Sequence, residues 1–206
     1  MTIYTFYQYL FALYGPQHWW PCQSGSRWEI VCGAILTQNC AWINVGKALA
    51  NLAQKNFACP QAILAAPDLE LEEAIRPAGF FRQKRAYLQA SAEFLLAHET
   101  EFLNSEDLPA LRQRLLAVRG VGRETADSIL LYAFQKPVFV IDAYTRRVAE
   151  RHLRLPGGLA YDALQGVFQA SLPRETQLYN EFHALIVCFC KESCRKAGCG
   201  HDCPER

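Results

Sequence analysis

The segment Leu115-Leu-Ala-Val-Arg-Gly-Val-Gly-Arg-Glu-Thr-Ala-Asp127 decides the fold expected for this chain. Its apolar residues, at helical spacing, lead into Gly120-Val121-Gly122, and a second helix is expected to begin near Arg123. Glycines allow a tight turn and the close approach of a partner because they carry no Cβ. The segment therefore predicts two helices joined by a short hairpin.

The start of the second helix has the properties of an anion site. The first amides of a helix have no partner within the helix and lie at its positive dipole end. Arg119 and Arg123 flank these amides. Such a site can hold one phosphate of a nucleic acid backbone without reading base sequence. The alternative is an ordinary corner between packed helices, with glycines at the bend.

Composition limits the classes of protein that this chain can be. With 206 residues, 51% hydrophobic and 20% charged, it can bury the core of one or two small domains. A net charge of +1 excludes a polybasic protein, but residues 111–155 hold nine Arg or Lys residues against four acids. This local excess favours a phosphate-facing surface around the hairpin, the alternative being a solvated helical face.

Helical periodicity runs through the chain and the strand pattern is negligible, so we expect an all-α protein. Helices are expected over 4–14, 28–36, 43–52, 67–75, 86–97, 108–118, 123–133, 143–152, 161–170 and 174–190. No signal peptide or membrane-spanning stretch is recognised, which predicts a cytoplasmic protein, associated with the nucleoid if it is bacterial. In that compartment the nine cysteines are not expected to form disulfides.

Two segments outside the hairpin carry further candidate residues. Val138-Phe-Val-Ile141 leads to Asp142, where an N-cap would start the next helix, a role compatible with catalysis. Gly79 opens a turn that presents Phe80 and Phe81, followed by cations at positions 82, 84 and 85. An apolar ring beside cations suits a DNA wedge. The alternative is one buried and one half-exposed Phe.

Tryptophans mark two more candidate positions. In Trp19-Trp20-Pro21, adjacent rings cannot easily face one core, so one ring is a candidate pocket wall, although core packing is the commoner role. Gln38 and Asn39 have amides that can pair with base edges, and Trp42 offers a face for stacking. The alternative is that they cap and seal the loop.

Together, the hairpin, the later aspartate and the terminal cysteines resemble the helix-hairpin-helix DNA glycosylases of the endonuclease III superfamily. The family hairpin corresponds to residues 117–126, and the family segment Val-Asp-Thr-His corresponds to 141–144. The resemblance implies two helical lobes with DNA in the cleft between them. One lobe would be a six-helix domain, residues 22–134, and the other would unite residues 1–21 with 135–206.

The resemblance also implies a reaction. Asp142 matches the catalytic aspartate of the family, which assists water attack at C1′ of a flipped nucleotide. Bifunctional members carry a Lys where this chain has Glu124, and a carboxylate cannot form the Schiff base that strand cleavage needs. We therefore expect a monofunctional DNA N-glycosylase that leaves an abasic site, with no Lys-dependent lyase activity.

The chain is especially similar to the endonuclease III-like 3-methyladenine DNA glycosylases, through the segments 19–21, 37–42 and 120–127. That similarity implies removal of alkylated purines from double-stranded DNA. We expect the protein to be a monomer. The similarity also implies a base pocket formed by Trp20, Pro21, Trp42 and Glu124. It implies DNA contacts by Gln38, Phe80, Arg119, Gly120, Val121, Gly122 and Arg123. The alternatives are a thymine or uracil mismatch glycosylase on the same scaffold and a non-catalytic DNA-damage-binding protein.

Five cysteines lie between Cys188 and Cys203. The superfamily pattern Cys-x6-Cys-x2-Cys-x5-Cys holds a [4Fe–4S] cluster. By resemblance, Cys194, Cys199 and Cys203 match its first three ligands with altered spacing, and Cys190, or Cys188 as substitute, would supply the fourth. We therefore expect a structural [4Fe–4S] cluster. His201 as a ligand, zinc in place of iron, or no metal remain alternatives.

Overall fold

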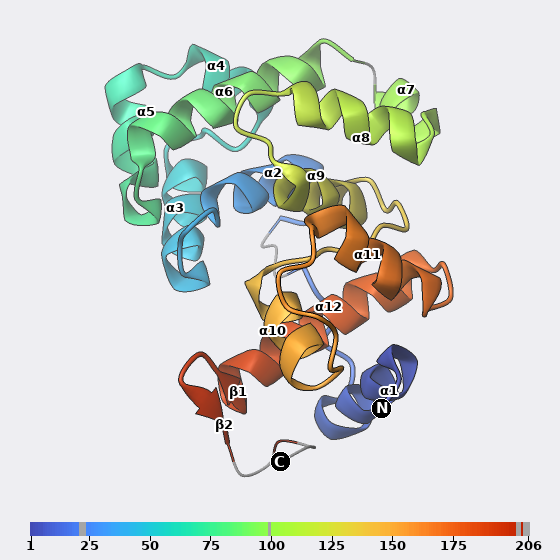
Figure 1. The fold of residues 1–206 in the computed structure, drawn as a ribbon. Helices are drawn as coiled ribbons and strands as arrows, with labels where there is room; N and C mark the ends of the chain where they lie inside the picture. The colour runs from blue at the N-terminus through green and yellow to red at the C-terminus, as the bar shows by residue number, and fades with distance from the viewer. Residues whose placement is uncertain (21–23, 99, 201–202, 204–206) are drawn as a thin grey trace. The chain divides into compact units, whose positions relative to one another are not determined.

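The computed structural model describes residues 1–20, 24–98, 100–200 and 203. The chain separates into two compact units: unit 1 joins Met1–Pro21 to Gln135–Arg206, and unit 2 is Cys22–Phe134. The elements (Figure 1) are α1 (Ile3–Tyr14), α2 (Arg27–Leu36), α3 (Trp42–Gln54), α4 (Pro60–Ala65), α5 (Asp68–Ile75), the 3-10 helix η1 (Arg76–Ala78), α6 (Phe81–Leu96), α7 (Thr100–Ser105), α8 (Leu108–Ala117), α9 (Arg123–Ser128), the π-helix η2 (Ile129–Ala133), α10 (Ala143–Arg151), α11 (Tyr161–Ala170), α12 (Thr176–Glu192), β1 (Cys194–Arg195) and β2 (Gly198–Cys199).

The all-α expectation is confirmed. Within the described residues the only strands are β1 and β2, a two-residue antiparallel pair that places Cys194 opposite Cys199. None of the helices in the described part of the chain is long and apolar enough to span a bilayer.

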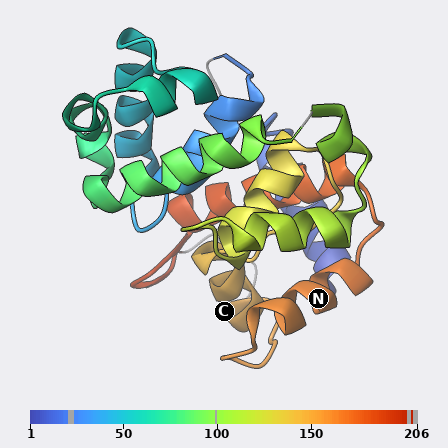
Figure 2. The same cartoon turned by 90° about the horizontal axis from the view of Figure 1, so that it is seen from above.

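Unit 2 is built around α2. Its residues from Trp28 to Leu36 are buried, except for the half-buried Glu29, and it packs against α3, α6, α9 and η2. A helix that is apolar on nearly every side must be surrounded by others. Ser26 starts α2 by accepting a hydrogen bond from the Glu29 amide at 3.1 Å. In Figure 2 the green helix α6 runs alongside α4 and α5, which pack against it.

Unit 2 contains more helices than the sequence pattern predicted. The pattern predicted six, but the described residues form eight α-helices, because α4 and α7 were missed. Each has only six residues, which is too short for an apolar face to repeat. In addition, α6 begins at Phe81 rather than Ala86, because the polar residues of its first turn hid the helical pattern.

The hairpin between α8 and α9 is held by contacts within unit 2. Gly120 has φ +85°, and the Gln38 side-chain amide donates to its carbonyl at 3.0 Å and to Thr125 Oγ1 at 3.1 Å. Arg112 on α8 makes a bidentate ion pair with the buried Asp127 on α9, at 2.7 and 3.0 Å. The two helices are thus locked together on either side of the turn.

Unit 1 has an aromatic core around α12. Both α1 and α10 pack against α12, which carries eleven buried residues. Phe139, in the extended segment before α10, stacks on Phe168 with ring centroids 4.8 Å apart. It also meets Phe182 edge-on at 5.6 Å. This packing fixes the extended segment and hence the start of α10, where Asp142 lies.

The two hairpin glycines should respond differently to substitution. In Gly120→Ala the new Cβ would lie 2.1 Å from the Tyr87 ring. We expect about 1–2 kcal/mol of destabilisation from the left-handed backbone and a further ~1–3 kcal/mol from the displaced ring. Gly122 has an extended backbone, φ −87° and ψ 179°, and a Cβ added there would meet nothing within 4 Å. Gly122→Ala should change stability by less than about 0.5 kcal/mol.

Urea unfolding of both variants and the wild type measures this difference. Equal midpoints for Gly120→Ala and the wild type would show that the glycine is not required by the fold.

Candidate functional site

Asp142 is the N-cap of α10 in unit 1. Its Oδ1 accepts a hydrogen bond from the Thr145 amide at 2.7 Å, and its Oδ2 lies 3.6 Å from Nε2 of His183 on α12. The side chain is mostly buried, with 15% of its area exposed. The structure therefore gives Asp142 the capping role on a mostly buried side chain.

The surroundings of Asp142 favour its charged form. Burial alone would raise the pKa of Asp142, but the charge of His183, 3.6 Å away, and the hydrogen bond from the Thr145 amide outweigh burial and hold the pKa below its usual value. A lowered carboxyl pKa means that the anion persists to lower pH than in an exposed aspartate. The N-terminus of α10 favours the same negative charge.

The sequence interpretation missed His183 as the partner of Asp142. The ring of Trp19 stacks on that of His183 with centroids 5.8 Å apart, and Trp19 in turn stacks on Trp20 at 5.9 Å. Both tryptophans are half-buried. It is thus Trp19, beside the predicted pocket residue Trp20, that contacts the histidine next to Asp142. Pro21 lies outside the described residues.

Unit 2 holds the other predicted base-pocket residues and the DNA-contact residues. Trp42 is the half-buried first residue of α3, and Glu124 is exposed in the first turn of α9. Since Trp20 belongs to unit 1, a pocket shared by Trp20, Trp42 and Glu124 stays a prediction.

The hairpin residues differ in exposure. Arg119, Gly122 and Arg123 are exposed, whereas the Val121 side chain is buried. Any contact that Val121 makes with a ligand is therefore through its main chain. The α9 segment continues directly into η2, so the helix that starts at the hairpin is longer than α9 alone.

Gln38 and Phe80, both predicted to contact DNA, line one surface pocket together with Asn39, Gln83, Lys84 and Tyr87. Phe80 is 67% exposed and has φ +45°, a left-handed conformation that is costly for a bulky residue. An exposed aromatic ring on a strained backbone is typical of a functional position. The Gln38 amide, in contrast, is engaged with the hairpin.

The cations after Phe80 correct the sequence interpretation. Lys84 is 2% exposed and donates to the Leu36 and Ala78 carbonyls, both at 2.8 Å. Arg85 is paired with Asp68 and Glu72. Only Arg82 of the three is mostly exposed, so Lys84 and Arg85 support the turn from within rather than facing phosphates.

The same correction applies to the basic excess in residues 111–155. Several of its arginines are engaged internally, because main-chain carbonyls and a carboxylate accept their hydrogen bonds. Arg112 pairs with Asp127, Arg146 donates to the Leu159 carbonyl, and Arg147 and Arg151 donate to carbonyls near β1. The excess is therefore partly structural.

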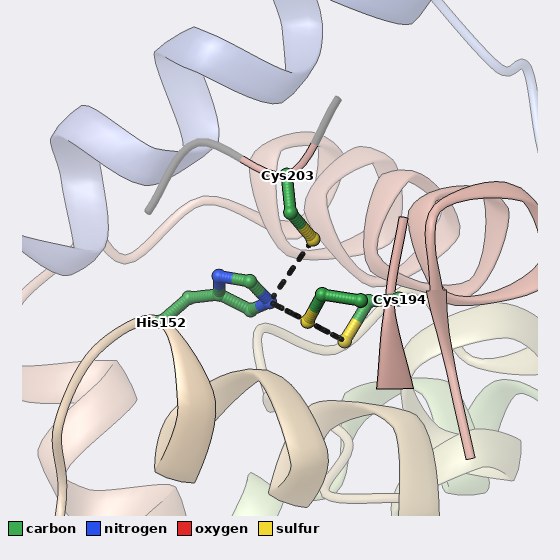
Figure 3. A group of neighbouring side chains, drawn as sticks. His152, Cys194 and Cys203 are labelled. Carbon is green, nitrogen blue, oxygen red and sulfur yellow. Dashed lines mark hydrogen bonds between the residues drawn. The ribbon is translucent and has the colours of Figure 1, made fainter. Parts of the chain in front are cut away.

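The terminal cysteines form a compact group with a histidine in unit 1. The ligand atoms of His152, Cys194, Cys199 and Cys203 all lie within 4.8 Å of one another. His152 Nε2 is 3.3 Å from Cys194 Sγ, 3.6 Å from Cys199 Sγ and 3.7 Å from Cys203 Sγ. Figure 3 shows the imidazole facing the sulfurs of Cys194 and Cys203. This group could hold a metal ion.

The fourth member of the group differs from the predicted one. The predicted fourth ligand, Cys190, lies outside it, with Sγ 3.7 Å from the Tyr144 carbonyl. The substitute, Cys188, has its Sγ 3.7 Å from Glu192 Oε1. The pKa of Cys194 is lowered to about 3, most by the neighbouring Cys190 thiol and further by His152, Cys199 and Arg151, and the pKa of Cys190 is raised. His201 lies outside the described residues.

Comparisons with known proteins identify the family of this chain. Residues 32–169 match the family model for the HhH-GPD superfamily of base excision DNA repair proteins. A protein of Methanocaldococcus jannaschii, provisionally named as a DNA repair glycosylase, is 42% identical over 98% of this chain and 93% of its own length.

Two solved structures share the fold. The H. pylori 3-methyladenine DNA glycosylase MagIII, bound to 1,N6-ethenoadenine, is 29% identical, with a TM-score of 0.80 over 93% of this chain and 98% of its own. A trapped covalent complex of endonuclease III with DNA is 20% identical, with a TM-score of 0.82 over 99% of this chain and 93% of its own. Since the family model matches more than half of the sequence, this chain belongs to the HhH-GPD superfamily of base excision DNA repair proteins.

Proposed function

We propose that this protein is a monofunctional DNA N-glycosylase that flips alkylated purines of the 3-methyladenine type out of double-stranded DNA and removes them, leaving an abasic site. The observation that carries the proposal is the Asp142 carboxylate, kept ionised by His183 and the Thr145 amide at the start of α10. Its position matches the catalytic aspartate implied by the family resemblance.

The charge of Asp142 suits the chemistry of glycosidic bond cleavage. As the bond to the base breaks, the electron pair leaves with the base and positive charge develops on the sugar. An anionic carboxylate stabilises that charge, orients a water molecule towards C1′ and accepts its proton. An N3- or N7-alkylated purine is already cationic, so it leaves as a neutral base without prior protonation. Asp142 is then the principal catalytic residue.

Glu124 supports the monofunctional assignment. A lyase of this superfamily forms an imine between a lysine amine and the sugar, and Glu124 occupies the corresponding position of the hairpin. Glu124 has a carboxylate in place of the amine and therefore cannot form that imine. Strand cleavage by this route is therefore not expected.

The hairpin and the Phe80 turn supply the proposed DNA contacts. Gly122, with no Cβ and an exposed backbone, allows a phosphate to approach the first amides of α9, beside the exposed Arg119 and Arg123. The exposed Phe80 ring can fill the gap that a flipped base leaves in the stack. We propose that the protein binds DNA as a monomer in this way.

Base specificity is proposed from the tryptophans and the similarity to MagIII. Trp20 and Trp42 offer aromatic faces that attract a cationic purine. The MagIII structure, which is bound to 1,N6-ethenoadenine, is the solved relative with the higher identity of the two compared above. A panel of duplexes with 3-methyladenine, 7-methylguanine, G·T and G·U tests the assignment. Release of thymine or uracil, but not of methylated purine, would favour a mismatch glycosylase.

Asp142→Asn tests the proposed mechanism without removing the helix cap. Asn is as good an N-cap as Asp, so the helix cap should remain, while loss of the anion should lower base release by about 10²–10⁴-fold. Single-turnover release of 3-methyladenine measures the effect. Undiminished release by a folded Asp142→Asn protein would exclude the mechanism, and no release by the wild type on any lesion would favour a non-catalytic DNA binder.

His183→Gln tests the control of the Asp142 charge. The lowered pKa of Asp142 means that wild-type activity persists as pH falls and is lost only when the carboxylate finally protonates. Removal of the His183 charge should raise that pKa, so the acid limb of the pH–rate profile should move to higher pH. His98→Gln, which removes a histidine bonded to the Phe94 carbonyl, is the control. Superimposable profiles for His183→Gln and the wild type would contradict this role.

Phe80→Gly separates stability from function. Glycine accepts the left-handed backbone at this position, so the free energy of unfolding should not fall. Base release from duplex DNA should drop by about tenfold if the ring offsets ~1.4 kcal/mol of the unstacking cost. Leu69→Ala, at an apolar residue 81% exposed on α5, is the matched control. A destabilised but fully active Phe80→Gly protein would assign Phe80 to folding alone.

A further inference from the structure

We infer that His152, Cys194, Cys199 and Cys203 form a Cys₃His site for a single tetrahedral metal ion of the zinc class. The inference rests on unit 1 alone and is independent of the proposed glycosylase reaction. It departs from the [4Fe–4S] cluster that the family resemblance implies.

The distances within the group fit one ion. In a tetrahedral zinc site with Zn–S near 2.3 Å and Zn–N near 2.05 Å, two sulfurs lie about 3.8 Å apart, and nitrogen and sulfur about 3.6 Å apart. Cys194 Sγ and Cys199 Sγ are 3.6 Å apart. The three distances from His152 Nε2 to sulfur are 3.3, 3.6 and 3.7 Å. These four separations are thus within about 0.3 Å of the single-ion values, and the two sulfur–sulfur pairs that involve Cys203 lie within 4.8 Å.

The same distances do not fit a four-iron cluster. Each iron of such a cluster takes its own protein ligand, so the ligand atoms must stand apart by more than the ligands of one ion. Here all four ligand atoms lie within 4.8 Å of one another, which leaves no room for a cluster between them. The donor set also differs, because an imidazole stands where the family pattern has a fourth thiolate. The spacing Cys-x4-Cys-x3-Cys departs from that pattern as well.

The surroundings of His152 hold its ring in the ligating orientation. His152 is 1% exposed and stacks on Phe6 of α1, with centroids 5.7 Å apart and ring planes 12° apart. Phe189 of α12 meets it edge-on at 5.1 Å. Aromatic contacts on two sides therefore fix the imidazole plane and direct Nε2 towards the sulfurs.

The sulfurs are positioned by the β1–β2 pair and by Arg151 at the end of α10. Antiparallel pairing of β1 with β2 sets Cys194 opposite Cys199, which brings their side chains together on one face. Arg151 donates to Cys194 Sγ at 3.7 Å and to the Arg195 carbonyl at 2.8 Å. Three thiolates and a divalent ion carry a net charge of −1, which the Arg151 guanidinium offsets.

The ion would connect the β1–β2 pair to α10, the helix that Asp142 caps. Asp142 is the N-cap of α10 and His152 is its C-cap. Binding at the C-terminal end would hold α10 in place, and its energy would add to folding, as in other structural zinc sites. We therefore expect the ion to be structural.

Metal analysis of the full-length protein tests the inference directly. The protein is produced in cells supplied with both iron and zinc, purified anaerobically without chelators, and analysed for zinc, iron and acid-labile sulfide. We expect one zinc ion per chain and no labile sulfide. Iron with stoichiometric sulfide and broad visible absorbance would overturn the inference, as would a protein that retains no metal or forms a disulfide in this group.

Cobalt substitution identifies the ligands. The chain with zinc removed should bind Co²⁺ and show the intense visible bands of a tetrahedral ion with thiolate ligands, which added Zn²⁺ should abolish. His152→Cys should keep cobalt and shift those bands to longer wavelength, because a fourth thiolate replaces the imidazole. Octahedral, weak bands from the wild-type protein would contradict the proposed geometry.

Serine variants distinguish the proposed ligands from the neighbouring thiols. Cys203→Ser should reduce bound zinc at least tenfold, whereas Cys190→Ser and Cys188→Ser should retain one ion per chain. If Cys190→Ser loses the metal and His152→Asn keeps it, Cys190 is the fourth ligand and the assignment of His152 is wrong. These experiments measure metal content and not base release. A negative result would therefore overturn the metal site without affecting the proposed glycosylase reaction, and an inactive protein could still confirm the metal site.

Discussion

The function proposed for this protein depends on one capped helix terminus. The Asp142 carboxylate accepts a hydrogen bond from the Thr145 amide at 2.7 Å and lies 3.6 Å from His183 Nε2. The side chain that caps the start of α10 is therefore also kept ionised. A carboxylate held by a main-chain amide and a neighbouring histidine has little freedom to turn away from a substrate. The aromatic core beneath it, where Phe139 stacks on Phe168, fixes the segment that delivers it.

The same helix links the two chemistries of unit 1. Its N-cap is the proposed catalytic carboxylate and its C-cap, His152, belongs to the Cys/His group. A structural ion there would stabilise a helix of only nine residues from the end opposite to the reaction. In unit 2 the DNA-contact candidates also fall into two groups, one structural and one exposed. Gly120 and Gln38 shape the hairpin through internal contacts, whereas Gly122 and Arg123 stay exposed.

Local features of this fold were predictable from the sequence, and distant partnerships were not. The hairpin and the N-cap role of Asp142 follow from neighbouring residues, and both were predicted. His183 and His152 were missed because each meets its partner across more than forty residues, with no local pattern to reveal it. Lys84 was misjudged because composition cannot distinguish a surface cation from a buried one that caps two carbonyls. The spacing of the cysteines could not predict His152 as the fourth ligand in place of Cys190, because His152 lies at the end of another helix, α10.

The central claim is that this chain breaks the glycosidic bond with water rather than with an amine. Borohydride treatment during turnover on a duplex containing 3-methyladenine tests it most directly, because borohydride reduces an imine to a stable covalent adduct. We predict release of free 3-methyladenine, an intact strand that breaks only on later alkali treatment, and no trapped protein–DNA adduct. A trapped adduct that forms in proportion to base release would contradict the account.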